Sequence, residues 1–273
     1  MSLIEQALTR ARGLTGNAPE VHRPARRLIR RSAVPLPGAP PPRSFTAATI
    51  DAETMERFGV LRDAADDLAL RAYKILRTRI LKRMEAQKWH SVAVTSAEPG
   101  DGKTLTAINM AMALAQEPGT SVFLVDLDLQ RPSVARYLGM NHGPGLSQYL
   151  AGEASMEQVI YDIGVERLSV LPNTQALHGS SELLASARMT ELVRFLEAES
   201  PRRIIVYDMP PALVGDDVMA FSNYVDSVLL VISEGKTTRA AVENARGVLT
   251  DMNLIGVVLN RSVQNKDAAY SYY

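Results

Sequence analysis

Residues 96–104, Ser-Ala-Glu-Pro-Gly-Asp-Gly-Lys-Thr, follow closely on an apolar run, Val-Ala-Val, at positions 92–94. The run predicts a buried strand, and the Ala-, Leu- and Met-rich residues at 104–116 predict a helix. Gly100 and Gly102 let the backbone turn tightly, so that its amides can surround a phosphate group. A strand, a glycine-rich loop and a helix in this order predict a loop that binds the phosphates of a nucleotide.

The side chains of this loop suit the same ligand. Lys103 can reach the β- and γ-phosphates, and the Thr104 hydroxyl can ligate Mg²⁺. The positive end of the following helix adds to the attraction for phosphate. Ala97 stands where the motif usually has its first glycine. The residues expected to bind the nucleotide here are Gly100, Asp101, Gly102, Lys103, Thr104 and Leu105.

Two further strand-like segments end in carboxylates. Residues 122–128, Val-Phe-Leu-Val-Asp-Leu-Asp, supply Asp126 and Asp128, and residues 204–211, Ile-Ile-Val-Tyr-Asp-Met-Pro-Pro, supply Asp208. In a parallel sheet the carboxyl ends of the strands line the crevice where a ligand binds. We therefore expect these acids beside the phosphate loop. Asp208 would act on Mg²⁺ through a water, because Mg²⁺ gives up its waters reluctantly.

Strand-like and helical segments alternate along most of the chain. Strands are expected at 91–96, 121–126, 167–171, 203–208, 227–233 and 254–259, and helices near 61–84, 104–116, 181–198 and 238–252. This alternation predicts an α/β fold, a doubly wound and mostly parallel sheet with helices on both faces.

The chain resembles the bacterial tyrosine autokinases, a family that phosphorylates itself on a tyrosine cluster and regulates exopolysaccharide export. The likeness covers about residues 68–273. It is carried by three nucleotide motifs, at 97–104, 122–128 and 204–211, and by the C-terminal Ala-Ala-Tyr-Ser-Tyr-Tyr. The resemblance implies an ATP-dependent protein-tyrosine kinase with ATP and Mg²⁺ as cofactors.

The resemblance also suggests catalytic roles, for Lys103, Asp126, Asp128 and Asp208. A carboxylate within reach of the tyrosine hydroxyl can take its proton. Asp126 is our first choice for this base, with Asp128 as a metal-side or positioning residue, but the two roles could be exchanged. The residues expected around the metal ion are Thr104, Asp126 and Asp208.

Asn260 ends the last expected strand, and it and the following Arg261 are also expected to bind the nucleotide. Asn260 is similar to the family residue that hydrogen-bonds adenine, and its amide can both donate and accept. The alternative is an ordinary turn residue.

The three tyrosines at the end of the chain, Tyr270, Tyr272 and Tyr273, would be the phosphorylation sites. The polar residues 264–269 before them favour entry of the tail into the site of another copy, so we expect a homo-oligomer. No apolar run approaches the roughly 20 residues needed to span a bilayer. The resemblance therefore implies a separate transmembrane protein that controls polysaccharide chain length and recruits a cytoplasmic kinase to the membrane.

Two positions depart from the family pattern. Gln130 stands where the second motif usually has Arg, and Arg131 follows it. The family's Glu-x-x-Arg-x-x-Arg helix motif, used for ring assembly, aligns with Arg71, Lys74 and Arg77. Because an acid has become a base, the ion pairing between subunits that the motif would supply is altered, and the sequence leaves open whether a ring forms.

Two other functions remain open. Partitioning or septum-positioning ATPases share the fold but carry a lysine five residues before the loop lysine, where this chain has Glu98. An ATP-sensing regulatory subunit with weak catalysis would fit the altered motifs. The chain has no cysteine, which excludes an iron–sulfur scaffold ATPase, thiolate-bound zinc and a cysteine nucleophile.

Charge and composition predict three regions. Residues 1–58 would be a Pro/Arg-rich and largely disordered segment, 59–263 the kinase domain, and 264–273 a flexible tail. Residues 1–50 carry a net charge of +6, and the rest of the chain carries −6. The basic segment could be a solvated tail or a docking arm for an acidic partner or anionic lipid. A nucleic-acid partner is not expected.

Overall fold

The computed structural model describes residues 45–61, 68–173, 175–177, 179–198 and 202–262. Most of the Pro/Arg-rich segment and the predicted phosphorylation sites Tyr270, Tyr272 and Tyr273 lie outside the described residues.

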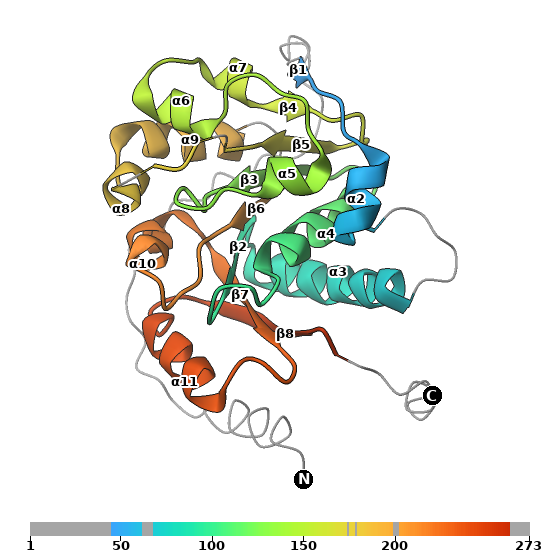
Figure 1. Cartoon of the computed structure of the whole chain (residues 1–273), viewed down its shortest axis with the longest axis vertical. Helices are drawn as coiled ribbons and strands as arrows, with labels where there is room; N and C mark the ends of the chain where they lie inside the picture. Colours follow the sequence, from blue (N-terminus) through green and yellow to red (C-terminus); the bar gives the residue numbers. More distant parts are fainter. Residues whose placement is uncertain (1–44, 62–67, 174, 178, 199–201, 263–273) are drawn as a thin grey trace. The chain divides into compact units, whose positions relative to one another are not determined.

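The described chain forms one sheet with the strand order β1-β4-β5-β3-β6-β2-β7-β8 (Figure 1). Neighbouring strands are parallel except β4 and β5, so the predicted, mostly parallel sheet is confirmed. The strands are β1 Thr46–Ala47, β2 Ser91–Ser96, β3 Ser121–Asp126, β4 Tyr161–Asp162, β5 Leu168–Leu171, β6 Arg203–Asp208, β7 Ser227–Ser233 and β8 Leu254–Asn260.

The helices surround this sheet. They are α2 Ala52–Phe58, α3 Leu68–Gln87, α4 Lys103–Ala115, α5 Val134–Leu138, α6 Leu146–Ala151, α7 Met156–Val159, α8 Ser180–Leu184, α9 Ala187–Ala198, α10 Asp217–Phe221 and α11 Arg239–Val248, with a 3₁₀ turn at Ser222–Tyr224. None of the helices formed by the described residues is long and apolar enough to cross a membrane.

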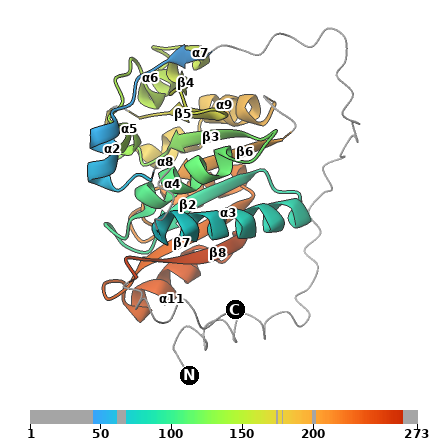
Figure 2. The same cartoon turned by 90° about the vertical axis from the view of Figure 1, so that its right-hand side faces the viewer.

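Each face of the sheet carries its own apolar core, because successive strand residues point to opposite faces. In β2, Val92 and Val94 join a cluster that contains residues of α3 and α4, whereas Ala93 joins a cluster that contains residues of α9 and α11. Figures 1 and 2 show the sheet between these helices. Helices therefore cover both faces, as the alternation of elements predicts.

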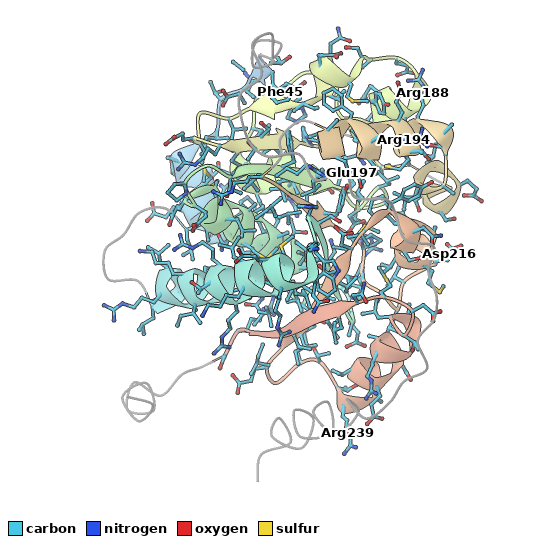
Figure 3. All side chains as sticks on the ribbon, turned by 180° about the vertical axis from the view of Figure 1, so that it is seen from behind. Phe45, Arg188, Arg194, Glu197, Asp216 and Arg239 are labelled. Atoms are coloured by element: carbon cyan, nitrogen blue, oxygen red, sulfur yellow. The ribbon has the colours of Figure 1, made fainter. Side chains whose placement is uncertain are left out.

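The folded domain begins earlier than the boundary predicted at residue 58. Strand β1 pairs with β4. Phe45, labelled in Figure 3, directly precedes β1, and its ring meets that of Phe123 edge-on with centroids 6.0 Å apart. Met55 of α2 is buried in the core, and the Phe58 ring stacks on Tyr137. Residues 45–58 thus belong to the folded domain, because apolar side chains among them, such as Met55, pack into it.

A half-buried carboxylate, that of Asp226, sets the pairing of β2 and β7 at their amino ends. Asp226 Oδ2 accepts the backbone N–H of His90 at 2.8 Å and that of Ser91 at 3.0 Å, together with the Ser91 hydroxyl at 3.0 Å. The two strands then run in register from Val92 opposite Ser227. These bonds lie at the end of the sheet opposite the phosphate loop.

Candidate nucleotide and active site

The loop between β2 and α4 has the backbone that a phosphate site requires. Gly100 and Gly102 have φ angles of 80° and 93°, in the left-handed region that favours glycine. A Cβ added at Gly102 would lie 2.0 Å from Asn260 Nδ2, so a larger residue has no room there. No side chain among the described residues caps the N-terminus of α4 at Lys103. The first amides of α4 can therefore bind an anion.

The carboxyl ends of β3 and β6 converge on Lys103. Asp126 and Asp208 are direct register partners in β3 and β6, and Asp128 follows β3. The Lys103 ammonium lies 2.8 Å from Asp128 Oδ2 and 3.4 Å from Asp208 Oδ1. The Thr104 hydroxyl donates to Asp208 Oδ2 at 2.6 Å. The structure therefore brings the predicted lysine, hydroxyl and carboxylates into one cluster.

Burial makes this cluster electrostatically unusual. Asp126 and Asp208 are fully buried, and Lys103 is only 9% exposed. Burial, and next the charge of Asp208, raises the pKa of Asp126 to about 8. Burial also raises the pKa of Asp208, although Lys103 acts in the opposite direction. Burial would lower the pKa of Lys103, but Asp208 and then Asp128 outweigh it and raise that pKa. The single positive charge of Lys103 thus lies among three carboxyl groups, and it cannot balance all of them.

The two carboxylates of the second motif differ in their partners. Asp126 Oδ2 accepts the backbone N–H groups of Ser133 and Val134, each at 2.9 Å. Asp128 accepts the backbone N–H of Arg131 at 3.0 Å through Oδ1 and pairs with Lys103 through Oδ2. Asp126 therefore holds the start of α5, whereas Asp128 reaches the lysine of the phosphate loop.

The oxygen atoms of the site fit a magnesium ion held jointly with a nucleotide. No group of three or more His, Cys, Asp or Glu among the described residues could hold a metal ion by itself. Mg²⁺ typically uses one or two carboxylates, phosphate oxygens and waters, so it needs no such group. The Thr104 hydroxyl and Asp208, in direct contact, offer these donors. The uncompensated acid beside them would be neutralised by a divalent cation.

Comparison with known proteins agrees with this geometry. Residues 90–264 match the family described as an AAA domain. Over 221 residues, 80% of this chain and 92% of its relative, the sequence is 33% identical to tyrosine-protein kinase YwqD of Bacillus subtilis. The chain belongs to the bacterial tyrosine kinases.

Other members of the family match in sequence and in structure. Tyrosine-protein kinase etk of Escherichia coli K12 is 30% identical over 212 residues, which span 77% of this chain but 29% of etk. The kinase domain of the Escherichia coli tyrosine kinase ETK superposes with a TM-score of 0.68 at 26% identity, covering 84% of this chain and 95% of that domain. The chain is therefore a P-loop protein-tyrosine kinase that spans less than a third of etk.

In this kinase, Asn260 joins the last strand to the phosphate loop. Its Nδ2 donates to the Asp101 carbonyl at 2.8 Å, and its Oδ1 accepts the backbone N–H of Arg261 at 2.9 Å. The amide keeps one further donor and one further acceptor position. Asn260 thus has a bracing role that the sequence does not reveal, and contact with adenine is still a prediction. Leu105, in the first turn of α4, is partly buried in the apolar core.

Gln130, at the position where the resemblance leads us to expect an arginine, belongs to a small polar network. Its Nε2 donates to Ser180 Oγ at 3.0 Å and to Asp217 Oδ2 at 3.2 Å, and Ser180 Oγ donates to Asp217 Oδ1 at 2.6 Å. The network ties the turn after β3 to the starts of α8 and α10. The neutral side chain of Gln130 therefore links these segments by hydrogen bonds alone.

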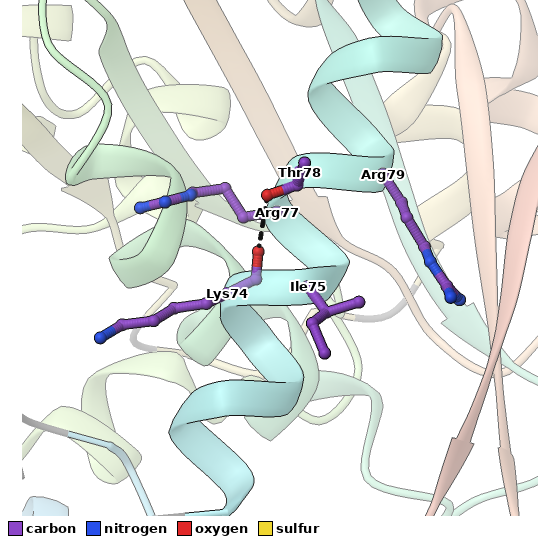
Figure 4. A pocket seen from close by; sticks show the side chains of 5 residues that line it. All are labelled: Lys74, Ile75, Arg77, Thr78 and Arg79. Carbon is purple, nitrogen blue, oxygen red and sulfur yellow. Dashed lines mark hydrogen bonds between the residues drawn. The ribbon is translucent and has the colours of Figure 1, made fainter. Parts of the chain in front are cut away.

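Helix α3 contains Arg71, Lys74 and Arg77, the three positions that the resemblance aligns with an assembly motif. Lys74, Ile75, Arg77, Thr78 and Arg79 of α3 line an open surface hollow of about 350 Å³ (Figure 4). The Arg77 guanidinium donates to the Ala113 carbonyl and to Gln116 Oε1, each at 3.4 Å, so it packs against α4. Ile75 is 53% exposed.

Proposed function

We propose that this kinase transfers the γ-phosphate of ATP, with Mg²⁺, to the tyrosines of its own C-terminal tail, and that it regulates exopolysaccharide polymerisation or export. The observation that carries the catalytic part is the contact of Lys103 with Asp128 and Asp208 at the mouth of the phosphate loop. The polysaccharide role rests on the family resemblance.

Binding of the nucleotide would rearrange the lysine. Phosphoryl transfer depends mainly on positioning and on neutralising charge. Lys103 would leave the carboxylates and bind the β- and γ-phosphates, while the amides around Gly100 and Gly102 hold the β-phosphate. Thr104 and Asp208 would hold Mg²⁺, which supplies further positive charge when bound.

We favour Asp128 as the base, which exchanges the roles first considered for Asp126 and Asp128. When Lys103 moves to the phosphates, Asp128 Oδ2 loses the partner that it has at 2.8 Å and can accept the proton of a tyrosine hydroxyl. Asp126 is fully buried and accepts three backbone N–H groups, so its role would be structural and electrostatic. Asp128→Asn should abolish transfer while nucleotide still binds. Retention of full activity in that variant would contradict this choice.

The acceptor tyrosines would be Tyr270, Tyr272 and Tyr273, presented to the site of a neighbouring copy. Each phosphate adds about −1.5 to −2 charge at neutral pH. The chain beyond residue 50 already carries a net charge of −6, so the modified tail should leave the site and the copies should separate. We also propose that a transmembrane chain-length protein recruits this cytoplasmic kinase to the membrane.

The decisive experiment uses two chains, Lys103→Met and an active chain whose three tail tyrosines are Phe. Each is incubated with Mg-ATP alone and in mixture, and phosphotyrosine is mapped by mass spectrometry. Label on the Lys103→Met chain only in the mixture supports transfer between copies. Label on unmixed Lys103→Met would refute the assignment of this site. Nucleotide binding without any phosphotyrosine in the unaltered chain would favour an ATP-sensing subunit.

A further inference from the structure

The outer side of the phosphate loop is held by a lysine from a distant part of the chain. Lys236 lies in the turn between β7 and α11. Its ammonium donates to the Pro99 carbonyl at 2.5 Å and lies 3.4 Å from Asp101 Oδ1. A Cβ added at Gly100 would lie 2.9 Å from the same ammonium, so the glycine leaves the space that Lys236 occupies.

The contact matters for phosphate binding because one of its partners, Asp101, is an acid within the phosphate loop. It lies between the two glycines of the loop, and it is fully buried. Its Oδ2 accepts the backbone N–H of Glu98 at 3.1 Å, which closes the loop on itself. Its carbonyl accepts from Asn260. A buried carboxylate in a loop that binds phosphates repels the ligand unless a cation neutralises it.

Lys103 is not placed to neutralise Asp101. It is paired with Asp128 and Asp208 on the inner side of the site, and it is the lysine expected to move to the phosphates. The ion pair of Asp101 is formed by Lys236, whose side chain is 41% exposed. Lys103 therefore contacts the carboxylates at the strand ends, whereas Lys236 contacts Pro99 and Asp101 of the phosphate loop itself.

We propose that Lys236 is a positioning residue of the nucleotide site, which neutralises Asp101 and fixes the Pro99 carbonyl so that the loop can accept a nucleoside di- or triphosphate. This inference rests on the nucleotide binding proposed above. Lys236 acts through Asp101 and the loop, with no contact of its own to the phosphates. Its contribution should therefore appear in nucleotide affinity and depend on the charge of Asp101.

The test measures the dissociation constant of Mg-ADP by titration calorimetry, together with KM for ATP and kcat for tyrosine phosphorylation. Lys236→Met should weaken Mg-ADP binding about tenfold, because the unpaired Asp101 carboxylate then repels the phosphates. The loss should not be larger, because Lys236 is partly exposed and a partly exposed ion pair contributes less than a fully buried one. KM for ATP should rise similarly, with kcat changed less. The double variant Lys236→Met with Asp101→Asn should recover most of the affinity, because the unpaired charge is gone.

Two further chains complete the design. Lys236→Arg keeps the charge and should bind Mg-ADP within about threefold of the unaltered chain, since the pair is mainly coulombic. Lys82→Met removes an exposed lysine of α3, outside the cluster, and should leave binding unchanged. Urea unfolding of every variant without nucleotide checks that the fold is kept.

Several outcomes would overturn the proposal. Unchanged Mg-ADP affinity in Lys236→Met would remove any role for the lysine. If the double variant binds Mg-ADP as weakly as Lys236→Met does, Lys236 does not act by neutralising Asp101. The same conclusion would follow if Lys236→Arg binds Mg-ADP as weakly as Lys236→Met. Failure of the unaltered chain to bind Mg-ADP would overturn this proposal and the proposed function together. Binding without phosphotyrosine would overturn only the kinase reaction.

Discussion

Replacement of Gly102 by alanine tests how tightly the phosphate loop is packed. The backbone φ there is 93°, and the new Cβ would lie 2.0 Å from Asn260 Nδ2 and 3.3 Å from its Cγ. Holding a residue other than glycine at positive φ costs about 1 to 2 kcal/mol. Displacing Asn260 removes the bond to the Asp101 carbonyl, and an unsatisfied buried acceptor costs about 1 to 3 kcal/mol more.

Gly164 provides the matched control. Its φ is 73°, and an added Cβ would meet nothing within 4 Å. Gly164→Ala should therefore lose only the cost of holding alanine at positive φ, about 1 to 2 kcal/mol of unfolding free energy. Urea unfolding without nucleotide measures both variants. Gly102→Ala should lose about 1 to 3 kcal/mol more than Gly164→Ala, and much of that excess should vanish in an Asn260→Ala background. Equal losses at the two glycines would refute the argument from close packing.

Three further substitutions have defined outcomes. Asp208→Asn should weaken Mg-ATP binding more than binding of metal-free ATP, measured by calorimetry, because the carboxylate acts through the ion; equal losses would make its role structural. Asp226→Ala removes the acceptor of three hydrogen bonds from His90 and Ser91 and should lower the urea unfolding free energy by about 2 to 4 kcal/mol. The pKa of Asp126 is raised to about 8 in the folded chain, so the folded state holds this proton where the unfolded state has lost it, and stability falls as pH rises from about 4 to about 8. Asp126→Asn should flatten this pH dependence when unfolding is followed without nucleotide or Mg²⁺, and an unchanged slope would show that Asp126 is ionised.

Local sequence signals account for most of the sheet. Apolar runs bounded by polar or turn residues place β2, β3, β6 and β7 at the predicted residues, because each strand is buried on both faces. Strands β1 and β4 are two residues long, and such short segments carry no periodic pattern. The predicted domain start at residue 59 also lies after α2, although Asp51 and Gly59 are recognisable caps of that helix.

The candidate site, like the sheet, is predicted only in part by local sequence signals. The convergence of Lys103, Asp126 and Asp208 follows from the order of motifs, because carboxyl ends of parallel strands meet at one edge. Lys236 carries no motif, and its contact with Pro99 joins segments 137 positions apart. A partner at that separation depends on how β7 is placed beside β2, which the sequence of either strand alone does not specify.

That placement makes the length of β7 a functional constraint. Asp226 fixes the amino end of β7 against β2, and Lys236 must meet Pro99 beyond the other end. A strand rises about 3.3 Å per residue and alternates its faces. Deleting one residue of this seven-residue strand would draw Lys236 away from the loop by that distance and turn the core side chains to the wrong face. Relatives that keep this lysine contact should vary in side chain between Asp226 and Lys236, but they should show no insertion or deletion there.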